Sequence, residues 1–570
     1  MAKDSTLDKI IVCMGFQNQT EFFLKYVLPV FSGMLIALTL CVLFLTSVKS
    51  IVFVVLFILG LITMVVYPLI IFEQIKMEID ENMHLFITFA GSISTLDIQR
   101  NILFKKIAEK EAFGALSDVA KKIMYLAKSW NLGFATACRK MGKIVPSKVL
   151  GDFLDRFAIM MDFGQSLQVF LHDEQIAVMD DYAVEYKKSL ERIRTTQDIF
   201  LALTMALSFM MSIGLLLPLI SNTDVNIVVY YILATVIIID MMVVLFVYNF
   251  IPADTLCHNL KHKDAGTRRI EKAMYISLPI SMIGLVFLTY INWLPFIANI
   301  AISIIPLFFV GTLAQAEEEE VYKRDKSYAA FIRSLGSGIE VRQGAIVSSL
   351  YALQVHDFGP LNEMSIALYR RLRTGNNKMK AWDLFGAESG SNLIVQFTNI
   401  FAEAVSLGGS AEKIGEIISV NFQKLLALRK LRIQLSSALR GALYGGMVGF
   451  SMSAYVAAQI TDLLGGILSN PMNGVESGDL GSLIGNAAPV SSFSFNIEKI
   501  LFVIGIMVMV HAVASGLIIK IVEGGSMYAA FFDICILIWI GATMGLALPW
   551  MLEKLLPGLK ETFGVDPLAT

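Results

Sequence analysis

The chain of 570 residues lacks most of what a soluble enzyme needs. Charged residues make up only 16% of it, and the formal net charge of −2 gives no overall field that favours nucleic acid. It has six histidines and five cysteines, and the cysteines form no CxxC pair. No Walker A loop, dinucleotide-binding glycine fingerprint, HExxH pair or GxSxG elbow is present. We therefore expect no catalysis, no cofactor and no bound metal.

Apolar residues, in contrast, are abundant. They make up 56% of the sequence, and the mean hydropathy is +0.66, which is too apolar for a single water-soluble core. Stretches of about twenty apolar residues are long enough to cross a bilayer. The sequence predicts nine such spans, near residues 27–47, 51–72, 199–220, 227–251, 273–292, 295–315, 441–461, 500–521 and 527–550.

Two long polar segments, 73–198 and 317–440, separate these spans. Apolar residues recur three and four apart in both segments, as in Leu361, Met364 and Leu368, which predicts helical bundles of five or six helices. The last helix of each bundle continues into a span. The fold class is therefore an all-α polytopic membrane protein.

The two polar segments also repeat one another, with an offset of 245 residues. Phe86 corresponds to Phe331, and Phe113-Gly114 corresponds to Phe358-Gly359. Four spans lie between the copies, so both bundles face the same side of the membrane. The sequence predicts a tandem, parallel duplication rather than an inverted one.

Lysine and arginine set the orientation of the chain. They precede the first span and fill the connection 252–272, whereas residues 461–497 contain neither. Both bundles and the N-terminus are assigned to the cytoplasm, and the C-terminus to the outside. The predicted segments are an N-terminal segment (1–26), a hairpin (27–72), bundle 1 (73–198), spans three and four (199–251), a basic connection (252–272), a second hairpin (273–316), bundle 2 (317–440), span seven (441–461), an external loop (462–499), spans eight and nine (500–550) and an external tail (551–570).

Charge in bundle 1 is segregated along the sequence. The stretch from Arg100 to Lys148 contains eleven basic and three acidic residues, whereas the stretch from Asp152 to Glu191 contains nine acidic and three basic residues. Such patterning can orient a protein partner, although solvated helix faces and binding to anionic lipid remain alternatives. The candidate docking residues are Lys105, Lys106, Lys121, Lys122, Arg139, Lys140 and Lys143 in bundle 1, and Arg370, Arg371, Arg373, Lys378 and Lys380 in bundle 2.

Polar and small residues inside the spans form a second set of candidates. Asp240, His511 and Asp533 lie within apolar segments, where charge is costly. We expect structural pairing there, with an ion or proton relay as the alternative. Small residues four apart allow helices to approach closely, within the chain or in a dimer. They are Gly441, Gly445, Gly449 and Ser453 in span seven, and Gly541 and Gly545 in span nine.

The duplicated hairpin, bundle and span arrangement resembles the type II secretion F-domain family, whose members form the inner-membrane platforms of type IV pilus machines. The helix 331–338 and the turn 407–410 look like the family's repeated motif, and residues 86–92 and 163–167 are weaker copies. With nine spans and a Gly-rich external loop, the chain is most similar to the platform proteins of the archaellum, the archaeal flagellum.

The resemblance implies a protein of the archaeal cell membrane that acts without catalysis. Such platforms work as homodimers in the lipid bilayer and engage a cytoplasmic hexameric ATPase. The motion of that motor drives assembly of filament subunits, archaellins or pilins, and in archaella it is linked to rotation. A secondary transporter with duplicated membrane units is the alternative from another functional class.

Overall fold

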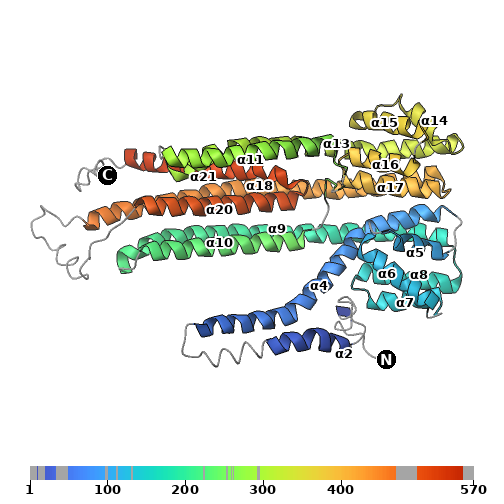
Figure 1. Ribbon diagram of the computed structural model, residues 1–570, viewed down its shortest axis with the longest axis horizontal. Coiled ribbons are helices and arrows are strands. Elements are labelled where there is room, and N and C mark those ends of the chain that lie inside the picture. Colours follow the sequence, from blue (N-terminus) through green and yellow to red (C-terminus); the bar gives the residue numbers. More distant parts are fainter. Residues whose placement is uncertain are drawn as a thin grey trace, which may run out of the picture. The chain divides into compact units, whose positions relative to one another are not determined.

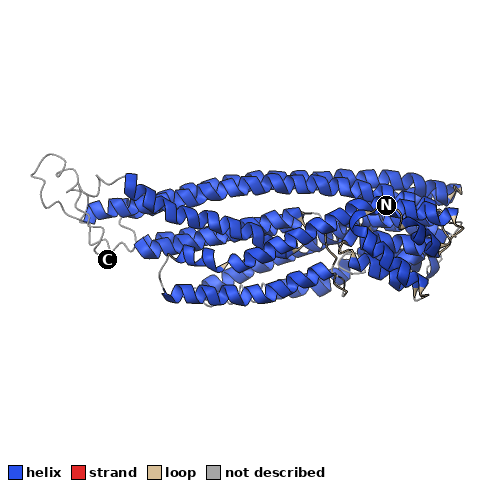
Figure 2. Ribbon diagram, turned by 90° about the horizontal axis from the view of Figure 1, so that it is seen from above, coloured by secondary structure: helices blue, strands red, loops and turns tan. Residues whose placement is uncertain are grey.

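Helices form almost all of the part of this computed structural model that is described (Figures 1 and 2). That part comprises residues 9–10, 19–33, 49–96, 100–110, 113–129, 132–221, 225–251, 255–258, 260, 262–291, 295–375, 377–469 and 497–555. Strand pairing within these ranges is limited to one isolated bridge between Cys257 and Ser391. The predicted all-α class is therefore confirmed.

The helices range from a single turn to 59 residues. They are α2 (Gln19–Phe22), the π-helical η1 (Phe23–Val27), α4 (Lys49–Ser94), α5 (Arg100–Ala108), α6 (Ala115–Ser129), α7 (Phe134–Ile144), α8 (Lys148–Phe163), α9 (Leu167–Ser221), α10 (Val225–Phe250), α11 (Ala265–Ile291), α12 (Phe296–Ser303), α13 (Ile305–Val341), α14 (Ile346–Leu353), η3 (Gly359–Leu361), α15 (Asn362–Arg373), α16 (Lys378–Glu388), α17 (Asn392–Ser406), α18 (Ala411–Ser469), α20 (Ile497–Glu523), η4 (Met527–Ala529) and α21 (Ala530–Leu555). Helices α9 and α18 each run unbroken from a predicted bundle into a predicted span.

The chain folds into two compact units. The first contains Met1–Glu185, Ser327–Gly386 and Leu393–Leu425, and so includes most of both predicted bundles. The second contains Tyr186–Lys326, Ala387–Asn392 and Leu426–Thr570. All predicted spans from the third onward lie in this second unit.

Aromatic side chains fill the core of the first unit. The ring of Phe86 meets that of Phe153 edge-on, with centroids 5.2 Å apart, and Phe331 stacks on Phe385 at 5.6 Å. Phe86 and Phe331 are the residues that the sequence repeat aligns, and both are buried. Each buried ring contributes roughly 1.5–3 kcal/mol to folding. These phenylalanines therefore anchor the packing around α4 and α13.

A buried polar seam lies in the same unit between α4, α9 and α18. The Asn421 side-chain amide donates to Thr88 Oγ1 at 2.8 Å, and Gln175 Nε2 donates to Asn421 Oδ1 at 3.4 Å. An exposed ion pair between Lys424 and Asp180, at 2.8 Å, continues this seam. Because buried polar groups require partners, the seam fixes the register of α18 against α9.

The turn between α8 and α9 depends on glycine. Gly164 has a φ of 68°, in the left-handed region that other residues enter only with strain. Its N–H donates to the carbonyls of Met160 and Met161, which closes the end of α8. The turn lies within residues 163–167, which the sequence comparison within the chain matches to the turn 407–410.

Asp80 on α4 gives the first unit a pH-dependent stability. Burial raises the pKa of this carboxyl, more than its contacts with Ser147 and Lys76 lower it. The folded chain therefore holds the Asp80 proton more tightly than the unfolded chain, whose carboxyl titrates near about pH 4. Wild-type stability should fall as pH rises from that value through the raised folded pKa.

We accordingly expect Asp80→Asn to raise the unfolding temperature at pH 7 and to lose this advantage near about pH 4. Asparagine keeps an acceptor for the Ser147 hydroxyl, which donates to Asp80 in the wild type. Thermal unfolding of the detergent-solubilised protein at both pH values checks this, with the exposed Asp118→Asn as control. A lower unfolding temperature for Asp80→Asn at pH 7 would show that the charge of this partly buried carboxylate is stabilising.

The second unit is built from long apolar helices. Helix α10 packs along α20, α20 and α21 form a hairpin, and α12 contacts both α20 and α21. Five described helices are long and apolar enough to cross a membrane: Leu167–Pro218, Ile227–Asn249, Ala265–Ile291, Ile497–Glu523 and Met527–Met551. A sixth candidate is the pair Phe296–Ser303 and Ile305–Val341, bent by 43° at its break.

These candidates coincide with six of the nine predicted spans. The first predicted span, 27–47, lies mostly outside the described residues. The second falls within α4, where the side chains of residues 51–66 lie outside the described set. The seventh, 441–461, is a helical part of α18 whose glycines and serines lower its hydropathy, so it is absent from the candidates. The count of nine spans stays a prediction.

Candidate functional site

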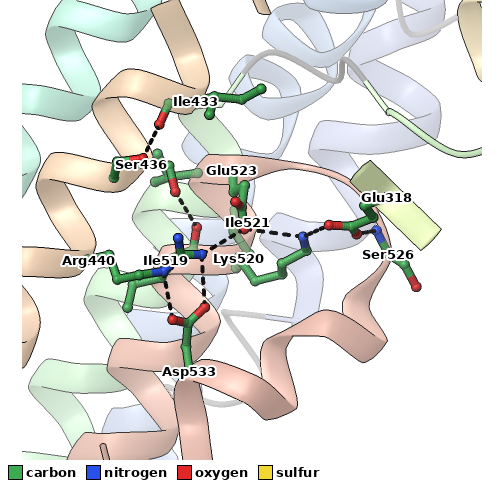
Figure 3. A network of polar contacts seen from close by, with 12 residues as sticks. Glu318, Ile433, Ser436, Arg440, Ile519, Lys520, Ile521, Glu523, Ser526 and Asp533 are labelled. Carbon is green, nitrogen blue, oxygen red and sulfur yellow. Dashed lines mark hydrogen bonds and ion pairs between the residues drawn. The ribbon is translucent and has the colours of Figure 1, made fainter. Parts of the chain in front are cut away.

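Arg440 on α18 lies at the centre of a polar network in the second unit (Figure 3). Its guanidinium donates to both carboxylate oxygens of Asp533 on α21, at 2.7 and 3.2 Å. It also donates to Glu523, at the end of α20, at 3.1 Å. The Tyr444 hydroxyl donates to the same Asp533 carboxylate at 2.6 Å. Asp533 is fully buried, so its charge depends on these donors.

Lys520 extends this network from α20 to α13. Its ammonium is almost fully buried and donates to Glu318 at 2.7 Å and to Glu523 at 3.3 Å. The other oxygen of Glu318 accepts the N–H of Ser526, in the turn between α20 and α21, at 2.6 Å. Figure 3 shows Glu318 reaching this turn. One carboxylate therefore holds the α20–α21 hairpin against α13.

The hairpin turn requires glycine at position 525 for two reasons. Gly525 has a φ of 88°, where a side chain is strained. A Cβ at this position would also overlap the carboxylate of Glu318. The close approach of backbone and carboxylate is thus built into the sequence of the turn.

Arg432 satisfies the end of α20, one of the helix ends where carbonyls lack intrahelical partners. Its Nε donates to the carbonyl of Val522 at 2.7 Å, and its Nη2 donates to that of Ile521 at 3.0 Å. The Ser436 hydroxyl, one turn further along α18, lies 3.5 Å from the carbonyl of Ile519. Side chains of α18 therefore bind both the backbone carbonyls and the charged side chains of the hairpin.

A cavity of about 330 Å³ lies beside the network. Three arginines of α18 (Arg429, Arg432 and Arg440) line it, together with three glutamates (Glu318, Glu319 and Glu523). Because these charges balance, the cavity favours neither an anion nor a cation. Its position makes it part of the same joint between α13, α18 and the hairpin.

Of the residues in this network, the sequence singled out only Asp533 as a candidate. It did not identify Arg440, Lys520 or Glu523 as partners. Their positions in the sequence could have indicated this role. Each of the three charged residues lies at the end of an apolar run, where a long side chain can reach a buried partner.

Asp240 and His511, predicted as separate intramembrane polar residues, meet one another. His511 Nδ1 lies 3.1 Å from a carboxylate oxygen of Asp240, joining α20 to α10, and both side chains are buried. The rings of Phe450 and Phe200 pack on the imidazole, with centroids 4.6 and 5.6 Å away. This geometry agrees with structural pairing, because each polar group supplies the partner that the other needs.

The small residues of span seven have two different environments. A Cβ added at Gly441, Gly445 or Gly449 would meet no atom within 4 Å among the described residues. Ser453, in contrast, donates to the carbonyl of Ser208 on α9 at 3.0 Å. Among the described residues, the three glycines therefore form an open face of α18, and packing within the chain involves only the serine end of this stripe.

The glycines of span nine are in close contact. A Cβ at Gly541 would overlap Val508 of α20, and one at Gly545 would lie 2.7 Å from the Tyr455 ring of α18. Both glycines thus allow α21 to approach its neighbours within the second unit.

Comparison with known proteins identifies the family. No family model and no solved structure matches the chain significantly. A relative from Methanocaldococcus jannaschii, flagella accessory protein J, is 30% identical over 536 residues, which cover 92% of this chain and 93% of the relative. The chain belongs to the flagella accessory protein J family. A second relative of the same name, from Methanococcus voltae, is 28% identical over 547 residues, or 94% of this chain and 96% of its own length.

The match confirms the predicted similarity to the archaellum platform proteins, whereas the wider relationship to the type II secretion F-domain family stays a prediction. Because it covers more than nine-tenths of the chain, membership of the flagella accessory protein J family applies to both bundles and to the polar network between the helices.

In this member of the flagella accessory protein J family, many basic residues of bundle 1 have acidic neighbours. Lys105 and Lys106 lie 4.0 and 3.4 Å from Glu109. Lys121 pairs with Asp118 at 3.0 Å. Arg139 pairs with Asp162 at 2.5 Å. No ion pair forms within the described ranges for the remaining three, Lys122, Lys140 and Lys143.

The basic residues of bundle 2 surround one turn. Arg370, Arg371 and Arg373 occupy the last turn of α15, and Lys378 and Lys380 occupy the first turn of α16. All are exposed except Arg371, which is partly buried. The structure therefore gathers into one place the five residues that the sequence proposed in this bundle.

Proposed function

We propose that this chain is the membrane platform of an archaellum, a non-enzymatic protein that couples a cytoplasmic hexameric ATPase to filament-subunit assembly and rotation. Relatives named flagella accessory protein J support the role in this machine, and five or six candidate spans support a membrane location. The observation that carries the mechanism is the continuity of α9 and α18. Each is one helix from bundle to span, 55 and 59 residues long, so a movement at the bundle end reaches the span without a flexible linker.

The contacts between α9 and α18 support a parallel, like-facing duplication. In the first unit, Lys424 pairs with Asp180, 244 residues earlier, and Gln175 bonds to Asn421 across 246 residues. In the second unit, Ser453 bonds to Ser208 across 245 residues. A constant difference in residue number requires parallel helices, since antiparallel helices keep a constant sum. Parallel helices support the proposed arrangement, in which the bundles that precede them lie on the same side of the membrane.

The network around Arg440 provides the second part of the mechanism. It ties α18 to α20, α21 and α13 through buried charges, which tolerate little separation because each charge needs its partner. In the proposed platform, a displacement of α18 therefore moves the α20–α21 hairpin with it.

The open glycine face of α18 supports a homodimer in the membrane. Gly441, Gly445 and Gly449 leave room for the backbone of a second helix, and small residues at this spacing favour helix association in lipid. In the proposed assembly, this face meets a second copy of the chain, the bilayer surrounds the remaining spans, and archaellins or pilins enter the filament beside the dimer.

Deletion of the gene in its source organism tests the proposed function. We expect cells without filaments, with the filament subunits accumulating in the membrane, and recovery when the wild-type gene is restored. Electron microscopy and membrane immunoblots measure both. Normal filaments in the deletion strain would overturn the proposal, and loss of a solute-uptake activity instead would favour the transporter alternative.

A further inference from the structure

Four exposed cations of bundle 2 lack charge compensation. Arg370, Arg373, Lys378 and Lys380 are exposed, and none forms an ion pair with a described residue. The nearest carboxyl in sequence, Asp383, has a pKa raised by burial, with no cation lowering it. The positive charge of this surface is therefore unneutralised within the described part of the chain.

The two lysines of this group stand on the capped first turn of α16. Asn377 Oδ1 accepts the N–H groups of Met379 and Lys380, at 3.1 and 3.4 Å, and so caps α16. Lys378 and Lys380 stand at the N-terminal end of that helix, where the helix dipole disfavours cations. The stability of the helix therefore does not explain why lysine occupies these two positions. Binding to an external anionic surface would explain it.

Two tyrosines extend the charged surface. The rings of Tyr351 on α14 and Tyr369 on α15 pack with centroids 5.7 Å apart, and Arg373 Nη1 donates to the Tyr369 hydroxyl at 3.4 Å. Tyr351 is 63% exposed. Tyrosine and arginine are the side chains that protein interfaces favour. We call Tyr351, Tyr369, Arg370, Arg373, Lys378 and Lys380 the α15–α16 patch.

Bundle 1 differs in this respect. Four of its seven candidate cations already have acidic partners within the same bundle. An external partner would have to compete with those carboxylates, although exposed ion pairs are weak. The α15–α16 patch offers unpaired charge with adjacent aromatic surface, and its helices are not among the candidate spans, so a protein surface fits it better than lipid headgroups do.

We infer that the α15–α16 patch is the surface on which an acidic face of the cytoplasmic ATPase docks. This inference rests on the proposed function and adds the location of the contact, in bundle 2 rather than bundle 1. Charge attraction steers the partner onto the patch, and the tyrosines supply the contact area once water is displaced. Such a contact weakens as salt screens the charges.

Binding of the purified secretion ATPase of the same organism to the full-length chain in nanodiscs tests the inference. The first variant combines Arg370→Glu, Arg373→Glu, Lys378→Glu and Lys380→Glu. The matched control carries the same number of reversals in bundle 1: Lys105→Glu, Lys106→Glu, Lys121→Glu and Arg139→Glu. A conservative variant, Arg370→Lys with Arg373→Lys, keeps the charge.

We expect the bundle 2 reversal to weaken binding by about tenfold or more, and the bundle 1 reversal to change it by less than about threefold. The conservative variant should bind nearly as the wild type does. An equal or larger loss in the bundle 1 variant would move the docking surface there and overturn the inference. Unchanged binding in both reversals overturns the inference but leaves the proposed function intact, whereas a wild-type chain that does not bind the ATPase overturns both. Loss of binding to anionic nanodiscs only, with binding to neutral ones unaffected, would show that the patch binds lipid.

Discussion

Arg440→Met should lower the unfolding free energy by about 3–5 kcal/mol, because it leaves a fully buried carboxylate without its cation. Asp533 would keep only the Tyr444 hydroxyl, at 2.6 Å. Glu523 would lose its contact with Arg440 as well. Denaturant or SDS titration of the purified protein in mild detergent measures the change. The same variant should loosen the α20–α21 hairpin, which keeps its contacts with Arg432 and Glu318, and this should be seen as moderately faster proteolysis in the turn at Gly525.

The rescue separates the ion pair from general damage. Adding Asp533→Leu to Arg440→Met removes the stranded charge, and replacing both partners of a buried pair is often close to neutral. The exposed Lys323→Met, which breaks surface pairs with Glu319 and Glu320, should leave stability unchanged. If the double variant is no more stable than Arg440→Met, the pair does not hold the joint.

Gly336→Ala should destabilise bundle 2 by about 2 kcal/mol. The added Cβ would overlap the carbonyl oxygen of Ala411, where α13 and α18 cross, and would press on the Cα of Gly415. Backbone atoms cannot rotate away, so the helices must separate, at a cost of roughly 1–3 kcal/mol or somewhat more. The better helix propensity of alanine returns only about 1 kcal/mol. Thermal unfolding and hydrogen exchange in α13 measure the loss.

The aligned position in bundle 1 provides a matched control. The atoms nearest to a Cβ at Gly91 belong to the end of the Gln175 side chain, which can shift at the expense of its hydrogen bond to Asn421. Gly91→Ala should therefore lower the free energy of unfolding by less than Gly336→Ala does. The two substitutions are otherwise matched, because each glycine lies five residues after an aligned phenylalanine. Equal costs at the two sites would show that the backbone crossing at Gly336 is not the cause.

The fold was largely predictable because it depends on local patterns. Long apolar runs gave the third to sixth, eighth and ninth spans, and helical periodicity gave the bundles. Phe86 and Phe331, which the predicted repeat aligns, are both buried. The apolar runs and the helical periodicity extend over only a few helical turns, and the repeat is a comparison of the chain with itself, so one sequence is enough to detect all three.

The partners of the polar residues were not predictable in the same way. Structural pairing of Asp240 was expected, but the partner was not identified: His511 lies 271 residues further along the chain. Arg440 and Asp533 are 93 residues apart. Such pairs depend on which helices become neighbours, and helix periodicity does not contain that information. The glycines of span seven and span nine show the same limit: both stripes look alike in sequence, but only Gly541 and Gly545 contact another helix in the described chain.

The side of the membrane on which each bundle lies tests the account most directly. Single cysteines at Lys122 in bundle 1 and Lys378 in bundle 2, both exposed, can be introduced into a chain whose five native cysteines are replaced by serine. We predict that a membrane-impermeant maleimide labels both in inverted membrane vesicles and neither in right-side-out vesicles, with Ser482→Cys in the predicted external loop showing the reverse. Labelling of Lys122→Cys and Lys378→Cys from opposite sides would contradict parallel coupling helices and the platform mechanism built on them.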